Sequence, residues 1–223
     1  MKYQIKDEPF TILVCKMNAG ESLKCQSGAM AWMTPGISME TKAGGLGGAF
    51  KKALIGESLF LSTYTANSDG EIAFAKRLPG EILAFNIGET PLIAQKGSFL
   101  ASTPNVQMDI YLQKKIGAGL VGGEGFIMQK FSGTGYVFLE IDGATEIKEL
   151  APGEKLVIDS GYIAAMDATC SMDIQMIKGF ANVIGGGEGL FNTVVTGPGR
   201  VWLQTMPVST LANAIARYLP PSN

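Results

Sequence analysis

Apolar and polar residues alternate along the first part of the chain. On either side of Pro9, alternate positions carry apolar side chains: Tyr3, Ile5, Phe10, Ile12 and Val14. This period of two is typical of a half-buried β-strand, because successive side chains of a strand point to opposite faces. The same alternation returns in two later segments, 108–112 and 172–176. The pattern therefore predicts a protein built mainly from strands.

A short phrase that begins with Gly-Glu occurs three times. The copies span residues 56–60, 123–126 and 187–191, and each leads into two β-rich runs separated by a turn with glycine. A second marker, Met-Asp-Ile, occurs at 108–110 and 172–174, and Met39-Glu40 is its counterpart in the first copy. Markers that return in one order indicate a protein built from structural repeats.

The markers divide the chain into three units, at about 19–78, 79–151 and 152–207. No long polar linker separates them, so we predict one domain over residues 1–223 with pseudo-threefold symmetry. Ser209 is a suitable N-cap for a helix over 209–219 that packs on the open end of the sheets. The predicted fold class is all-β, meaning mainly β with short helices and this C-terminal helix.

Each unit contains a glycine-rich apolar connector before the Gly-Glu phrase. So many glycines allow at most one or two helical turns, because each one costs up to about 1 kcal/mol in a helix interior. The connectors carry lysines at related places: Lys51, Lys52, Lys114, Lys115 and Lys178. Together they would form an apolar surface rimmed by cations, suited to an anionic membrane surface or a protein partner. The alternative is that the connectors pack inward and the lysines only face solvent.

Two sets of acidic residues occupy equivalent positions in the three units. One set is Glu57, Glu124 and Glu188, and the other is Glu40, Asp109 and Asp173. If a set converges on the pseudo-threefold axis, its carboxylates would coordinate a hard cation such as Ca²⁺. The alternative is that each acid ends a strand or turn and faces water.

Composition narrows the possible functions. The absence of histidine removes the commonest general base and a common zinc ligand. With three arginines and a net charge of −2, the clustered cations typical of nucleic-acid binding are missing. The segment 117–122 matches the dinucleotide pattern GxGxxG, but it lies in a connector of a β repeat rather than in a βαβ unit. We therefore predict no cofactor, no catalytic residue and no nucleic-acid partner.

The remaining composition bears on location and packing. Cys15, Cys25 and Cys170 include no CxxC pair, as expected of small buried side chains in a reducing cytoplasm. Trp32 is predicted to pack within the first unit, because its counterpart in the third unit is Ala165. Charged residues make up only 17% of the chain, so part of its apolar surface is expected to be covered by a partner or another subunit.

The glycine-rich connector that runs into Gly-Glu-Ser-Leu-Phe, residues 44–60, resembles the "altered inheritance of mitochondria" family. The resemblance extends from Tyr3 to Pro207. It implies a tryptophan RNA-binding attenuator-like β-sandwich or prism with internal threefold symmetry that assembles further. It carries over no catalytic residue. Mitochondrial members are linked to inner-membrane organisation, but this chain has no Arg-rich presequence and resembles a bacterial-type cytoplasmic member.

Together these features predict a non-enzymatic scaffold or interaction protein. It is expected to be a cytoplasmic homo-oligomer, with a place at the periphery of a membrane as a further option. The alternative is a small-ligand or metal-binding protein, or an enzyme, that uses the symmetry-related carboxylates.

Overall fold

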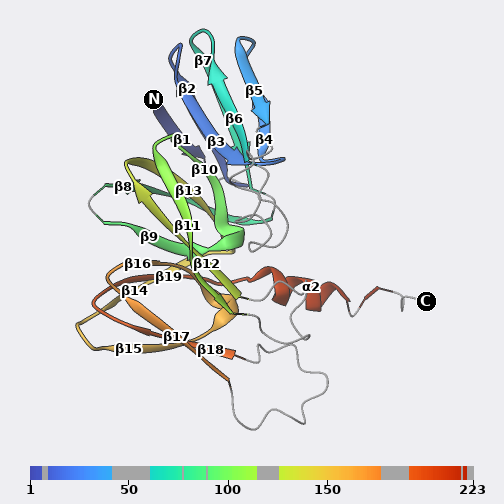
Figure 1. Ribbon diagram of the computed structural model, residues 1–223. Coiled ribbons are helices and arrows are strands. Elements are labelled where there is room, and N and C mark those ends of the chain that lie inside the picture. The colour runs from blue at the N-terminus through green and yellow to red at the C-terminus, as the bar shows by residue number, and fades with distance from the viewer. Residues whose placement is uncertain are drawn as a thin grey trace.

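The computed structural model describes residues 1–6, 10–41, 61–76, 78–88, 90–114, 126–176, 191–216 and 218–219. Nearly all of the glycine-rich connectors, and with them the predicted short helices, lie outside the described residues. The described chain passes through three units, which follow one another from the top to the bottom of Figure 1. We number the strands of each unit from first to sixth.

The strands have the following bounds. Unit 1 contains β2 (Ile12–Met17), β3 (Ser22–Gln26), β4 (Met30–Met33), β5 (Ile37–Thr41), β6 (Leu61–Ala66) and β7 (Gly70–Ala75). Unit 2 contains β8 (Gly80–Ile87), β9 (Leu92–Gln95), β10 (Phe99–Ser102), β11 (Val106–Lys114), β12 (Phe126–Gly133) and β13 (Gly135–Asp142). Unit 3 contains β14 (Thr145–Leu150), β15 (Lys155–Asp159), β16 (Ile163–Asp167), β17 (Ser171–Met176), β18 (Phe191–Thr196) and β19 (Gly199–Gln204).

Four further elements of the described residues lie outside these sets. Strand β1 (Lys2–Lys6) precedes unit 1, and helix α2 (Val208–Ala216) follows unit 3. The short 3-10 turns η1 (Lys96–Ser98) and η2 (Ser160–Tyr162) connect the second and third strands of units 2 and 3. The all-β prediction with a C-terminal helix is confirmed. The helix spans Val208–Ala216, so it begins one residue before the predicted N-cap Ser209 and ends before 219. Beyond Ala216 the Tyr218 amide donates to the Ile215 carbonyl, an i to i−3 hydrogen bond instead of the i to i−4 bond of an α-helix.

Helix α2 differs from the prediction in its environment. The helix was predicted to pack on the open end of the sheets, but none of the helix residues whose burial is described is buried. Tyr218 is 89% exposed. The helix therefore adds little to the apolar core.

Strands pair in the same way in every unit. The fourth, fifth and second strands form one half-sheet in that order, and the first, sixth and third strands form another. Strand β14 pairs with β19, so strand pairing groups residues 145–150, which precede the marker at 152, with unit 3.

Neighbouring units join edge to edge. The described strands form four sheets: sheet A (β1-β2-β7-β4), sheet B (β5-β6-β3-β10-β13-β8), sheet C (β11-β12-β9-β16-β19-β14) and sheet D (β15-β18-β17). In sheet B, the second strand of unit 1 (β3) pairs with the third strand of unit 2 (β10). In sheet C, β9 and β16 make the same antiparallel pairing between units 2 and 3. We call such a pairing a joint.

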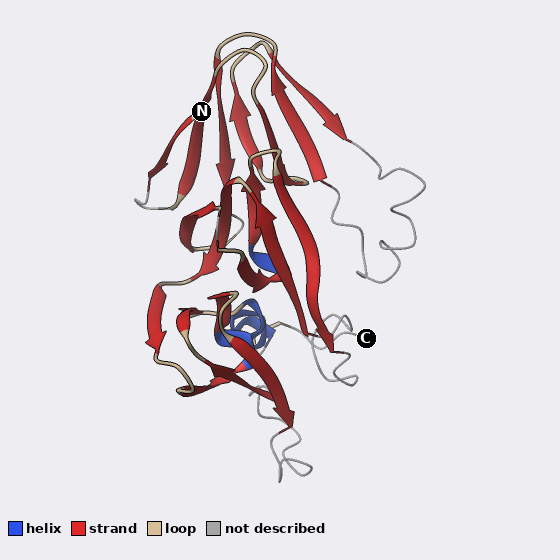
Figure 2. Ribbon diagram, turned by 60° about the vertical axis from the view of Figure 1, so that its left-hand side comes forward, coloured by secondary structure: helices blue, strands red, loops and turns tan. Residues whose placement is uncertain are grey.

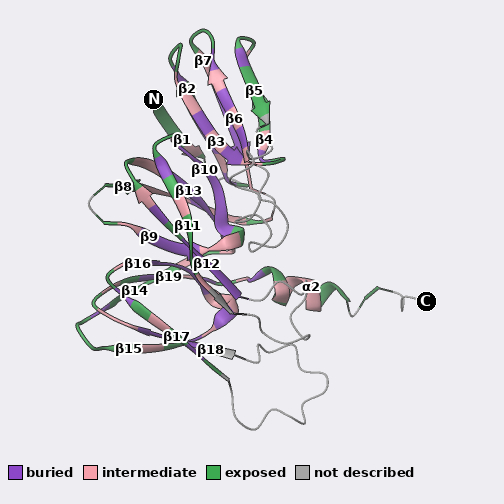
Figure 3. Cartoon of the chain, viewed as in Figure 1, coloured by how far each residue is buried: buried purple, intermediate pink, exposed green. Residues whose placement is uncertain are grey.

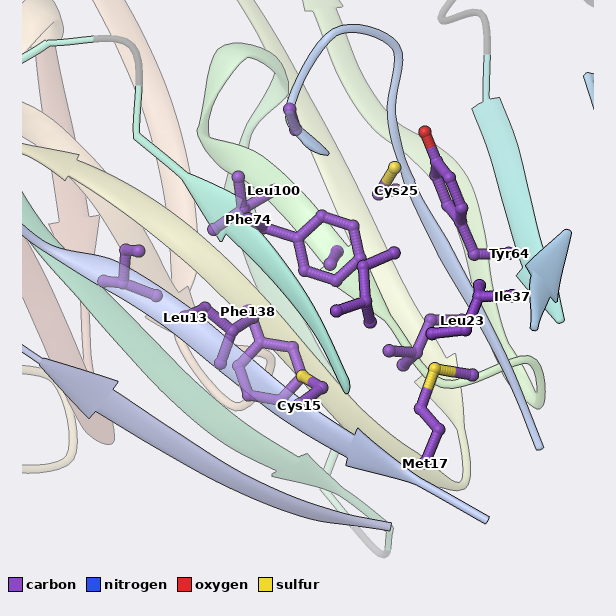
Figure 4. Close-up of a cluster of buried hydrophobic side chains, with 14 of the residues drawn as sticks. Leu13, Cys15, Met17, Leu23, Cys25, Ile37, Tyr64, Phe74, Leu100 and Phe138 are labelled. Atoms are coloured by element: carbon purple, nitrogen blue, oxygen red, sulfur yellow. The ribbon is translucent and has the colours of Figure 1, made fainter. Parts of the chain in front are cut away.

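The sheets stack in layers (Figure 2). Apolar clusters lie between the layers. Leu13, Phe74 and Phe138 belong to the cluster between sheets A and B, where the side chains from β2, β7, β10 and β13 point toward one another (Figure 4). A second cluster lies between sheets B and C, and a third between sheets C and D. Figure 3 shows buried positions along the middle strands of the stack. Sheets B and C are thus covered on both faces, whereas sheets A and D each have one face packed in these clusters.

Glycines open the sixth strand of each unit at a tight turn. Gly135 and Gly199 have φ values of 121° and 140°, a region that residues with a side chain rarely adopt. A Cβ at Gly135 would overlap the Thr103 hydroxyl, which accepts a hydrogen bond from the Tyr136 amide at 3.0 Å. The glycine of the repeated turn is therefore required by close approach as well as by backbone conformation.

Candidate interaction surfaces

The described acidic set lies on the outer strands of three different sheets. Glu40 is on β5, Asp109 on β11 and Asp173 on β17, and all three are exposed. Their positions correspond, because they stand opposite Thr63, Lys130 and Val194 of the adjacent strands. The structure does not bring them together. Among the described residues, no group of three or more His, Cys, Asp or Glu side chains could hold a metal ion.

The other predicted site residues lie largely outside the described part of the chain. This holds for Glu57, Glu124 and Glu188, and for Lys51, Lys52, Lys115 and Lys178. Lys114 ends strand β11, directly before the second connector. Both the cation site formed by the glutamates and the lysine-rimmed surface therefore stay predictions. Within the described residues, no helix has the length and apolar character needed to cross a membrane.

Two sheet edges differ from every other edge among the described strands. In sheets B and C, second and third strands lie in the interior, where each joint pairs one with the other. In sheet A the third strand, β4, is the last strand, and in sheet D the second strand, β15, is the last strand. These two strands each lack the neighbour that their counterparts have.

Strand β4 exposes side chains at positions that are buried in units 2 and 3. A bulge at the same place in β4, β10 and β16 makes Trp32, Ala101 and Ala165 equivalent. Trp32 is 41% exposed, whereas Ala101 and Ala165 are completely buried. The next position behaves alike, since Met33 is 37% exposed and Ser102 and Met166 are 2% and 0% exposed. Trp32 packs less completely within unit 1 than its sequence position suggested.

Strand β15 also exposes an apolar side chain whose equivalent in unit 2 is buried. Pairing with the fifth strand makes Val157 equivalent to Ile93, because they stand opposite Val194 and Lys130. Val157 is 63% exposed, while Ile93 is 1% exposed in sheet C. Both unpaired edges thus display apolar side chains that an additional strand and sheet would cover.

A small pocket near the end of sheet C was not predicted from the sequence. It has a volume of about 240 Å³ and is lined by residues of β8 and the following turn together with Asp167 and Arg200. Arg200 donates to both carboxylate oxygens of Asp167, at 3.0 and 3.2 Å, and its guanidinium lies 4.9 Å from the Trp202 ring centre. The hydrogen bonds to Asp167 raise the pKa of Arg200 above its ordinary value. The two charges of the pocket therefore neutralise each other.

The fold and its edges define an all-β protein in which six-stranded units are joined edge to edge into a stack. The sequence profile of a family described as "Mitochondrial biogenesis AIM24" matches residues 3–206, and the chain belongs to this family. The family expected from the segment 44–60 is thereby confirmed.

Two bacterial relatives illustrate this membership. The chain is 31% identical over 224 residues to the uncharacterized protein M6_Spy0233 of Streptococcus pyogenes serotype M6, covering 96% of this chain and 89% of the relative. It is also similar to the crystal structure of protein SPYM3_0169 from Streptococcus pyogenes, with a TM-score of 0.82 and 28% identity. That similarity covers 98% of this chain and 99% of the solved one, so the stacked fold is shared over nearly the whole length.

Proposed function

We propose that this protein is a non-enzymatic scaffold that works by associating with further copies of itself. The observation that carries the proposal is the exposure of Trp32, Met33 and Val157 at positions whose equivalents are buried in the joints between units. An uncovered strand edge with apolar side chains is a template for pairing with another chain, and soluble proteins usually protect such edges with charge, proline or a covering segment. Strand β4 consists of Met30, Ala31, Trp32 and Met33, without a charge or a proline.

The alternative, a small-ligand or metal-binding protein, has less support. The charged groups of the described pocket are paired with each other. The described acids of the symmetric set lie on three sheets. Neither arrangement offers an uncompensated charge aimed into a cavity, which is the usual mark of a binding or catalytic site.

A charged side chain at the exposed edge tests the scaffold proposal. We expect the unaltered protein to sediment as an oligomer, and Val157→Glu to sediment as a folded monomer, because a carboxylate at a buried contact would lose its hydration without gaining a partner. Ile147→Glu is the matched control. Ile147 is also a β-branched residue of an edge strand and is 54% exposed. It lies on β14, a first strand, whose counterpart β8 also ends a sheet, so β14 lacks no neighbour that its counterpart has. Sedimentation velocity and circular dichroism of the three proteins give mass and folding.

Two results would contradict the scaffold proposal. A monomeric unaltered protein over the whole accessible concentration range would contradict self-association. Equal effects of Val157→Glu and Ile147→Glu would show that general surface charge, rather than the unpaired edge, controls association.

We further propose that the scaffold lies at the periphery of a membrane, an expectation that rests on the connector lysines of the sequence. We expect the protein to float with anionic vesicles at low salt and to separate from them at high salt, because exposed charge pairs are screened by ions. The variant with glutamate at positions 51, 52, 114 and 115 should lose this binding, while neutral vesicles should bind neither protein. If no vesicle binds the unaltered protein, the scaffold acts away from membranes.

A further inference from the structure

We propose that β4 of one copy pairs with β15 of a second copy and that this contact reproduces the joint that already connects the units within the chain. The inference rests on the proposed self-association and specifies its partner strands and their register. Each internal joint pairs the second strand of one unit with the third strand of the next. Strand β15 is a second strand and β4 is a third strand, so the two unpaired edges are the two halves of one further joint.

The internal joints define the register of the contact. Ala101 stands opposite Cys25 in sheet B, and Ala165 stands opposite Ala94 in sheet C. The next pairs are Ser102 with Lys24 and Met166 with Ile93. Transferred to the equivalent positions at the ends of the chain, this register places Trp32 opposite Ile158 and Met33 opposite Val157. Both pairs are apolar, and aromatic and β-branched side chains facing each other across strands stabilise a sheet.

The faces of the strands agree with this register. Ile158 is 6% exposed and belongs to the cluster between sheets C and D, so Trp32 of the second copy would extend that cluster. Val157 points to the other side, where it would lie beside Met33 and beneath sheet B of the second copy. Its equivalent, Ile93, is covered by the sheet that follows sheet C. The contact thus gives each exposed side chain the environment of its counterpart.

The bulk of Trp32 is compensated on the neighbouring strand. Within the units, Ala101 stands opposite Phe138 and Ala165 stands opposite Trp202, whereas Trp32 stands opposite Ala73. One large and one small side chain are present each time, but their order is reversed in unit 1. The summed volume is therefore similar, as close packing at an equivalent joint requires.

The contact joins different copies in a head-to-tail manner. Strands β4 and β15 belong to the first and last units, at opposite ends of the stack, with sheets B and C between them (Figure 1). A contact between unlike surfaces is heterologous, so it produces a ring if the rotation closes and a filament if it does not. The composite sheet would contain six strands in the order β17-β18-β15-β4-β7-β2, as sheets B and C do, with β1 added at its edge.

Disulfide trapping tests the strand pairing and its register. In the full chain carrying Met33→Cys and Val157→Cys, we expect oxidation by diamide to give covalent dimers, trimers and higher species, because residues directly opposite have Cα atoms about 4.5–5.5 Å apart. The control carries Met33→Cys and Lys155→Cys. This pair is displaced by two residues, to about 7–8 Å, which is beyond the reach of a disulfide, so the covalent ladder should be lost.

The native thiols do not interfere with this test. Cys15 and Cys25 are 0% and 1% exposed, and burial raises the pKa of both thiols to about 12, while Cys170 is also buried.

A mixture of the two single variants should form only covalent dimers that contain one chain of each kind, whereas neither single variant alone should cross-link.

The outcomes separate this inference from the scaffold proposal. If the unaltered protein is oligomeric but the Met33–Val157 pair cross-links no better than the displaced pair, the register is overturned and self-association remains. Cross-linking of Met33→Cys alone would show that two β4 strands meet, which overturns head-to-tail pairing. A monomeric unaltered protein removes both proposals.

Discussion

Replacing Phe131 with alanine should lower the free energy of unfolding by about 3–5 kcal/mol, the usual cost of truncating a buried aromatic residue. Phe131 on β12 is completely buried between sheets B and C. Its ring stacks on Phe99 of β10, with centroids 5.9 Å apart and an interplanar angle of 15°. The truncation removes apolar burial and leaves a cavity between two sheets that many other contacts hold apart, so the site has little freedom to collapse.

Chemical denaturation followed by far-ultraviolet circular dichroism measures this loss. Phe131→Leu is the control, because leucine keeps most of the apolar volume and should cost clearly less than alanine. A change below about 1 kcal/mol for Phe131→Ala would mean that sheets B and C are not packed through this cluster as described.

Asp142→Ala should destabilise the protein by about 3–5 kcal/mol, because it leaves a buried ammonium group without its counter-charge. The Lys76 ammonium donates to Asp142 Oδ1 at 2.6 Å, and the side chains are only 2% and 16% exposed. Lys76 follows the last strand of unit 1, and Asp142 ends the last strand of unit 2. The pair therefore links two units close to the start of β8.

A double-mutant cycle separates the unpaired charge from the rest of the effect. Lys76→Met should recover much of the stability lost in Asp142→Ala, because it removes the charge that has lost its partner. Denaturant midpoints of the two single variants and the double variant provide the coupling energy. Additive losses would show that the ammonium reaches water or another partner when Asp142 is removed.

Much of the local structure follows from the sequence. Alternation at 108–112 and 172–176 predicted strands that the structure has as β11 and β17, since a strand with one buried face must alternate. The turn glycines were also visible, because Gly135 and Gly199 adopt a backbone conformation that other residues avoid. These features depend on residues that are close in sequence, so the sequence alone is enough to predict them.

The arrangement of the candidate cation site could not be predicted from the sequence. Equivalent acids suggested a meeting point on an axis, but Glu40, Asp109 and Asp173 lie on three successive sheets, because neighbouring units are joined edge to edge in a stack. Recurrence of a residue type shows that its local surroundings recur. It does not show that the copies meet.

The sequence by itself thus determined the mainly β fold class, several of the strands with their turns, and the family of the protein. Only the tertiary structure decided which strands end a sheet. Ala165 and Trp32 occupy equivalent positions, yet the first is completely buried and the second is 41% exposed. The physical reason is that the burial of a repeat position depends on the sheet that covers it, and a unit at either end of a stack lacks one of its neighbours.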